Sequence, residues 1–142
     1  MLMSGVTNRL NEKDSSGSIR SILGRKCRFD LWEPTTFAMH KALPYLDAVK
    51  EHGDTTRLRR AYTYKALNRL IQASAADMTK KSMVGIYKTG KIPLIQIHDE
   101  IAISVKDKEE ARKYSTIMET SIPLVVPNRC DIEIGASWGE AK

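Results

Sequence analysis

The stretch from Thr56 to Tyr87 constrains the fold of this chain more than any other. It contains no proline, and a glycine only near its end. Apolar residues recur in it at the spacing of one helix face: Leu58, Ala61, Ala66, Leu67, Leu70, Ile71, Ala75, Met78 and Val84. We therefore predict a long amphipathic helix that Gly90 and Pro93 terminate. Because it would be long for a globular helix, we expect a kink or break near residues 70–74.

Short apolar runs on both sides of this helix predict β-strands. The strands are expected at residues 19–23, 26–29, 94–97, 101–105, 122–126 and 130–134. The first two are joined at Gly24-Arg25, and the next two by the polar tripeptide His98-Asp99-Glu100. Each of these two pairs therefore predicts a β-hairpin.

Two further helices complete the predicted fold. One covers residues 4–13, and the other covers residues 107–120 with Asp107 as its N-cap. Residues 14–18 predict a turn, and residues 30–56 predict mostly loop with one or two helical turns around Phe37 to Leu43. The order of elements predicts an α+β fold, a small antiparallel sheet with packed helices.

Composition excludes several classes of protein. The chain has 142 residues, of which 42% are hydrophobic and 28% charged, which fits one globular domain and not a disordered chain. No apolar run is long enough to span a bilayer, and the N-terminus lacks the pattern of a signal peptide. We therefore expect no membrane partner and a cytoplasmic location, in a bacterium or a phage-infected cell. Cys27 and Cys130 lie far apart without ligand-spaced partners, which excludes a disulfide framework and a zinc site.

The net charge of +6 lies wholly in the first half of the chain. Residues 1–70 contain 13 Lys/Arg against 7 Asp/Glu, whereas residues 71–142 contain 10 of each. Clustered cations bind polyanions by displacing counterions condensed on the phosphates. At the first hairpin, Gly24 permits a tight turn that would direct Arg25 and Lys26 outward to phosphate oxygens. A nucleic-acid partner is predicted, although a solubilising basic surface would show the same charge.

The tripeptide His98-Asp99-Glu100 is the first candidate site. A carboxylate at the tip of a rigid hairpin is a suitable ligand for Mg²⁺, which takes one or two protein carboxylates and retains waters or substrate phosphates. Acidic residues are also ordinary in turns, so the tripeptide by itself leaves a structural role open.

A row of polar side chains on the predicted long helix is the second candidate site. Arg60, Tyr64, Asn68 and Gln72 are spaced four apart and would share one face. The Asn and Gln amides can donate to minor-groove acceptors that every base pair presents, so the row would sense duplex shape without reading sequence. A solvated helix face is the alternative.

Four segments together resemble the C-terminal part of family A DNA polymerases, the DNA polymerase I-like enzymes. They are Ile19–Lys26, Ala66–Asp77, Gln96–Glu100 and Ile134–Trp138, in collinear order. The resemblance runs from about Gly17 to Lys142, and the pairing of an Asn-x-x-x-Gln helix with a His-Asp-Glu hairpin makes it specific. The sequence is similar in style to phage-type members.

The resemblance implies a role for each matched residue. Asp99 would bind the catalytic metal ions, His98 would lie near the primer terminus, and Glu100 would be an accessory acidic residue. Asn68 and Gln72 would track the minor groove of the primer–template end. The implied reaction is attack of the primer 3′-OH on a dNTP, with two Mg²⁺ ions, or Mn²⁺, stabilising the attacking and leaving oxygens.

The sequence also departs from the family pattern. Ala73 replaces a usual glycine, and Tyr64 stands where many members have a basic residue. A second aspartate in an Asp-Tyr-Ser-type motif, and the fingers helix that grips the dNTP, are not found in these 142 residues. We therefore expect the chain alone to be inactive. Residues 1–56 would be a post-fingers segment with a basic hairpin and loop, and residues 57–142 the palm helices and sheet.

Two hypotheses follow from the missing motifs. In the first, this chain is one subunit of a split polymerase whose N-terminal chain supplies the first palm aspartate and the fingers. In the second, it is a non-catalytic DNA-binding module or an inactive polymerase remnant. A neighbouring reading frame that ends with the missing motifs would favour the first hypothesis.

Overall fold

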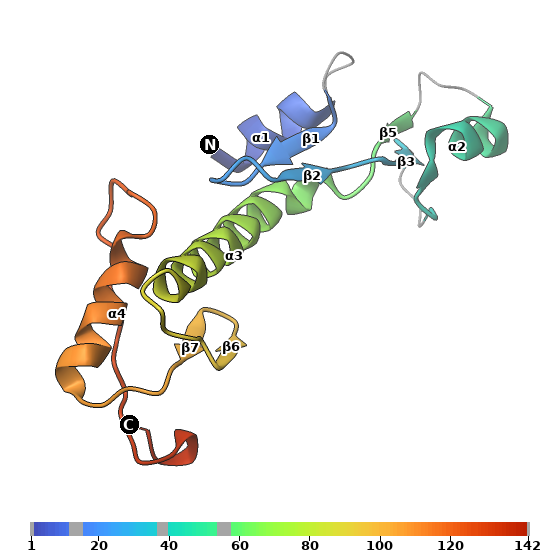
Figure 1. Ribbon diagram of the computed structural model, residues 1–142. Helices are drawn as coiled ribbons and strands as arrows, with labels where there is room; N and C mark the ends of the chain where they lie inside the picture. Colours follow the sequence, from blue (N-terminus) through green and yellow to red (C-terminus); the bar gives the residue numbers. More distant parts are fainter. Residues whose placement is uncertain (1, 12–15, 37–39, 54–57, 142) are drawn as a thin grey trace. The chain divides into compact units, whose positions relative to one another are not determined.

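The computed structural model describes residues 2–11, 16–36, 40–53 and 58–141. It divides into two compact units with the boundary between Ser74 and Ala75. Helices alternate with small antiparallel sheets along the chain (Figure 1), which confirms the predicted α+β class. No helix in the described part of the chain is long and apolar enough to cross a membrane.

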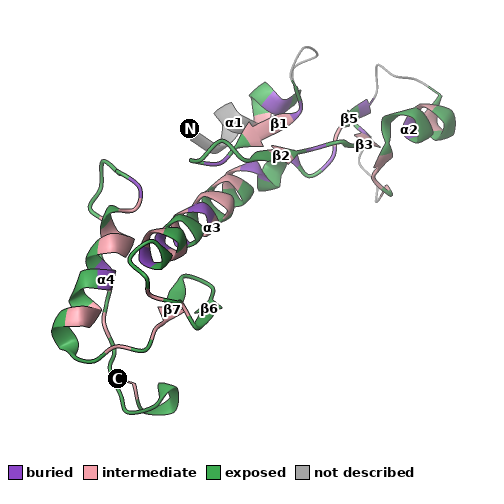
Figure 2. Cartoon of the chain, viewed as in Figure 1, coloured by how far each residue is buried: buried purple, intermediate pink, exposed green. Residues whose placement is uncertain are grey.

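The first unit is built around a helix and a hairpin. Helix α1 covers Leu2–Asn11, and strand β1 (Ser18–Arg20) pairs antiparallel with β2 (Lys26–Arg28). Leu10, Phe29 and Ala66 form a small buried core, and Ile19 packs against it. Figure 2 shows that buried segments are few and that most of the described chain is exposed or half-buried. The first predicted hairpin is confirmed, and α1 starts two residues before the predicted helix.

A second sheet and a helix occupy most of the segment for which loop was predicted, and the last strand of the sheet, residues 58–60, lies where the long helix was predicted to begin, so both predictions are wrong there. The helical turns expected around residues 37–43 lie partly outside the described residues, and residues 40–44 are not helical. Strand β3 (Leu31–Pro34) is central between β4 (Leu43–Pro44) and β5 (Leu58–Arg60), and helix α2 covers Tyr45–His52. The prolines end their strands, where a missing amide donor is tolerated. Residues 37–39 and 54–57 lie outside the described part of the chain.

Packing on β3 holds α2 in place. The Trp32 and Tyr45 rings meet edge to face at 5.1 Å, and Ala48 is fully buried. Gly53 ends α2 in the left-handed conformation (φ 70°), and its amide donates to the Val49 carbonyl at 2.9 Å.

The long helix is present but shorter than predicted. After β5, Tyr62 adopts a left-handed φ of 60°, a 3₁₀ turn η2 covers Thr63–Lys65, and α3 covers Ala66–Tyr87. Helix α3 is uninterrupted, so the predicted break near residues 70–74 is wrong. Its predicted apolar stripe is only partly buried, since Ile71 and Val84 are more than half exposed.

The second unit consists of the last part of α3, a hairpin and α4. Strands β6 (Ile95–Ile97) and β7 (Glu100–Ala102) pair antiparallel, as predicted. Helix α4 covers Lys108–Thr120, and a 3₁₀ turn η3 covers Trp138–Glu140. The Asp107 carboxylate accepts a hydrogen bond from the Glu110 amide at 2.8 Å, which confirms the predicted N-cap.

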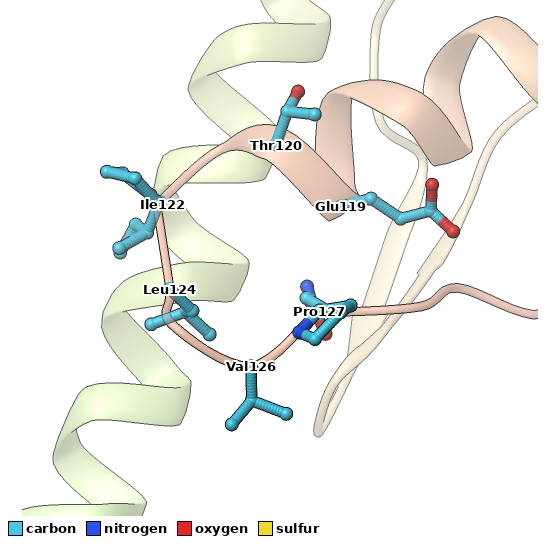
Figure 3. Close-up of a pocket in the computed structure, with 8 residues that line it drawn as sticks. Glu119, Thr120, Ile122, Leu124, Val126 and Pro127 are labelled. Carbon is cyan, nitrogen blue, oxygen red and sulfur yellow. The ribbon is translucent and has the colours of Figure 1, made fainter.

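The strands predicted at residues 122–126 and 130–134 are not formed. Pro123 and Pro127 have no amide hydrogen to donate to a ladder, and the Cys130 amide donates to the Glu119 side chain at 2.9 Å. The loop borders a shallow, open hollow of about 390 Å³, lined by residues 119, 120, 122–124 and 126–128 (Figure 3). Among the residues that line this hollow, Asn128 fixes the loop to the end of α4, because its side-chain amide donates to the Met118 carbonyl.

Candidate functional site

The two amide side chains of the predicted helical row lie on α3. Asn68 and Gln72 are both exposed and are one turn apart, about 6 Å along the helix axis. Arg60 lies in β5 and Tyr64 in η2, so a single helical row of four residues is wrong. The physical reason is the left-handed turn at Tyr62, which delays the helix to Ala66.

Arg60 is held against the core of the first unit. Its guanidinium lies 4.5 Å from the Trp32 ring centroid and donates to the Phe29 carbonyl at 3.0 Å. It also covers Gly17, where a Cβ atom would collide with it. Arg60 therefore packs within the first unit, a role that its charge alone did not indicate.

The turn of the first hairpin is attached to α3. Gly24 adopts φ 85°, and its amide donates to the Ser21 carbonyl at 2.8 Å. The Ile22 amide donates to the Ser74 hydroxyl at 3.1 Å, and the Arg25 guanidinium donates to the Ala73 carbonyl at 2.8 Å. Arg25 thus reaches the helix while remaining exposed, which corrects the expectation that it simply turns outward.

Lys26 follows this turn as an exposed side chain at the start of β2. It pairs in register with Arg20, whose guanidinium donates to the Gly24 carbonyl at 2.9 Å. Cations therefore lie on both strands beside the turn.

A cluster of aromatic rings around one cation precedes α3. The Lys65 ammonium lies 5.3 Å from the centroid of the Tyr62 ring and 5.6 Å from that of Tyr64. Tyr64 is 66% exposed and Tyr62 is 38% exposed. Sequence reasoning singled out Tyr64 and missed Tyr62 and Lys65, although the Tyr-x-Tyr-Lys spacing was a visible signal.

The second hairpin presents His98, Asp99 and Glu100 to solvent. His98 and Asp99 form the two-residue loop, while Glu100 lies in β7 opposite Ile97. His98 has a left-handed φ of 53°, a conformation that costs a residue with a Cβ atom about 1–2 kcal/mol. The Gln96 side-chain amide donates to the His98 carbonyl and supports the loop.

The carboxylates at this tip fit part of a metal site. Asp99 and Glu100 provide hard oxygen donors in the number that Mg²⁺ takes from a protein when waters and phosphates complete its shell. Across the described ranges, no group of three or more His, Cys, Asp or Glu side chains is placed to hold an ion. Further protein ligands would therefore come from outside these residues.

Glu110 links α4 to the segment that precedes the second hairpin. Its carboxylate accepts hydrogen bonds from the Lys106 amide (2.7 Å), the Lys91 ammonium (3.0 Å) and the Tyr114 hydroxyl (3.1 Å). The Lys106 amide, followed by Lys91, lowers the pKa of Glu110 to about 2. By contrast, burial raises the pKa of the Cys130 thiol, and the nearby charge of Glu119 adds to this effect.

Comparison with known proteins identifies the family. The model of DNA polymerase family A matches residues 5–140, which include both hairpins and all of α3. The chain therefore belongs to DNA polymerase family A.

The chain matches only a small part of the length of each individual relative. The chain is 51% identical over 80 residues to the "DNA-directed DNA polymerase" of Pseudomonas phage M6, covering 56% of this chain and 12% of the phage protein. It is 38% identical over 102 residues to "DNA polymerase I" of Borreliella burgdorferi, covering 65% of this chain and 11% of that protein. It is 34% identical over 116 residues to "DNA polymerase I, thermostable" of Thermus aquaticus, covering 76% of this chain and 13% of that protein. The chain spans about an eighth of the length of these relatives.

Proposed function

We propose that this chain supplies the C-terminal part of the active centre of a DNA-directed DNA polymerase. Its substrates would be primer–template DNA and a dNTP. One observation carries the proposal: within a chain of this family, Asp99 stands exposed at the tip of a hairpin whose loop is fixed by backbone pairing.

Asp99 is proposed as a metal ligand and not as a general base. Mg²⁺, or Mn²⁺ with its similar preference for oxygen ligands, would supply charge stabilisation at the attacking and leaving oxygens. Asp99 would hold the ion, Glu100 would add negative charge beside it, and His98 would face the primer terminus. The left-handed backbone at His98 sets the direction of the loop.

Asn68 and Gln72 are proposed to contact the minor groove of the duplex. Their amides can donate to purine N3 and pyrimidine O2, which are present in every base pair. Their axial spacing of about 6 Å is close to two base-pair steps of about 3.4 Å. Lys26 and Arg25, at the attached turn, would contact the phosphate backbone, whereas Arg60 would act mainly through its packing on Trp32.

A complementing polymerase region would supply the remaining metal ligands and the dNTP-binding residues. In the split-enzyme form of the proposal this region is a separate chain. Exposed apolar side chains in the second hairpin support a need for a partner: Leu94 is 64% exposed, Ile95 44% and Ile97 39%. Such side chains would be buried in a large, permanent interface.

Complementation tests the proposal. The chain is mixed with the Pseudomonas phage M6 polymerase truncated before its matching segment, and primer extension is measured. We expect activity only with both parts, and a loss of at least about 100-fold with Asp99→Asn, because the ion would lose its charged ligand. Asp131→Asn, which alters another exposed carboxylate of the same unit, is the matched control.

Two results would decide between the hypotheses. Extension that survives Asp99→Asn would reject the assigned role of Asp99. DNA binding without extension under any pairing would favour the non-catalytic DNA-binding module. Mass spectrometry of proteins that co-purify with the chain from its source then tests the split form, which requires a chain carrying the missing aspartate and fingers motifs.

A further inference from the structure

The turn between β5 and α3 alternates buried and exposed residues in a way that presents aromatic rings to solvent. Ala61, Thr63 and Ala66 are buried, whereas Tyr62, Tyr64 and Lys65 are exposed. The buried members fix the backbone, because the Thr63 carbonyl and hydroxyl each accept a hydrogen bond from α1 at 3.4 Å. The exposed members therefore project from an anchored turn.

Holding the rings in this position has a cost. Tyr62 adopts a left-handed φ of 60°, which is unfavourable by about 1–2 kcal/mol for a residue with a Cβ atom. Tyr64 leaves two thirds of its surface in water. Neither ring belongs to the buried core of the unit, so the core does not account for their arrangement.

We propose that Tyr62, Tyr64 and Lys65 form a stacking site for unpaired bases of single-stranded DNA. An exposed tyrosine ring offers a face on which any base can stack, with little dependence on sequence. The Lys65 ammonium, which borders both rings, would bind the phosphate between stacked nucleotides. A duplex does not expose its base faces, so the site would select unpaired nucleotides.

The stacking site lies close in the sequence to Asn68, which is proposed to contact duplex DNA. Tyr64 precedes Asn68 by four residues, and Arg69 adds a cation that lies 4.9 Å from the Phe29 ring centroid. Tyr64 lies in η2, directly before the first turn of α3 that contains Asn68. If Asn68 contacts the duplex as proposed above, an unpaired strand that leaves the duplex past the start of α3 would reach Tyr64 next. This last step rests on the proposed function, whereas binding of single-stranded DNA at the turn does not.

Oligonucleotide binding tests the site directly. Fluorescence anisotropy measures the affinity of the full chain for a labelled single-stranded oligonucleotide and for an abasic oligonucleotide of equal length. We expect Tyr64→Leu to weaken binding of the base-containing strand by about 5- to 100-fold, because it removes a stacking face. Tyr64→Phe should stay within about twofold, and abasic binding should not change.

Matched controls make each outcome decisive. Tyr87 is also 66% exposed, so Tyr87→Leu controls for loss of an exposed ring and should leave the affinity unchanged. The proposal is overturned if Tyr64→Phe fails as Tyr64→Leu does, or if Tyr64→Leu weakens abasic binding equally. Retained stacking in a chain that never supports primer extension would refute the polymerase role and leave this site intact.

Discussion

Helices α3 and α4 approach closely at Gly85. This contact predicts that Gly85→Ala lowers the free energy of unfolding in the natural chain and raises it once the Ile117 side chain is removed. A Cβ atom on Gly85 would lie 2.8 Å from the Ile117 Cγ2 atom, about 1 Å inside the best carbon–carbon separation. Gly85→Ala should gain about 1 kcal/mol in helix propensity and lose about 1–3 kcal/mol to overpacking. We expect a net destabilisation of up to about 2 kcal/mol.

Removing the Ile117 side chain should reverse this effect. In the Ile117→Ala background the overpacking disappears, so Gly85→Ala should stabilise the chain by about 1 kcal/mol. The coupling between the two changes should therefore be about 1–3 kcal/mol. Urea denaturation of the unchanged chain, the two single variants and the double variant measures this coupling. Hydrogen exchange of the α4 amides then shows whether the effect lies at α4.

Gly139 provides the control for this cycle. It lies in the same unit, and a Cβ atom there would meet nothing within 4 Å. Gly139→Ala should show no coupling to Ile117→Ala. Equal effects of Gly85→Ala in both backgrounds would refute the steric explanation of the α3–α4 contact.

Two further predictions concern the hydrogen bonds that hold each unit together. Because the pKa of Glu110 is lowered to about 2, its carboxylate should stabilise the fold above the unfolded value of about 4.3, and this stabilisation should vanish as the pH falls through 2. A carboxyl NMR titration of Glu110 should give a midpoint near 2, and Lys91→Met should raise it; a midpoint above 4 in both chains would contradict the geometry. Ser74→Ala should remove the acceptor of the Ile22 amide and lower the free energy of unfolding by about 0.5–1.5 kcal/mol. Faster exchange at the Ile22 amide checks this, and unchanged exchange there would mean that the turn is not held by Ser74.

Local signals in the sequence predicted the parts of the fold that local contacts determine. The second hairpin and the Asp107 cap depend on neighbouring residues, and both are confirmed. The sheet β4-β3-β5 was missed because its pairings join distant segments, such as Trp32 with Arg60. Proline and glycine in that segment indicated loop, although here they only end strands and a helix.

The candidate site shows the same division between local and distant causes. The spacing of Asn68 and Gln72 was predictable, since both lie within one regular helix. The places of Arg60 and Tyr64 were not, because the helix start depends on contacts between Thr63 and α1. Those contacts arise only when the chain has folded.

The loop after α4 also bears on how readily this segment could pair with another chain. Leu124, Val125 and Val126 are a β-prone run, and Val125 is fully exposed. Stacking into intermolecular β-structure favours segments of six or seven residues without proline. Pro123 and Pro127 bracket the run, and neither can donate to a ladder, so an intermolecular strand here would lack a backbone donor at each end of the run. The two prolines therefore make this loop a poorer template for intermolecular β-pairing than its three exposed apolar residues alone would be.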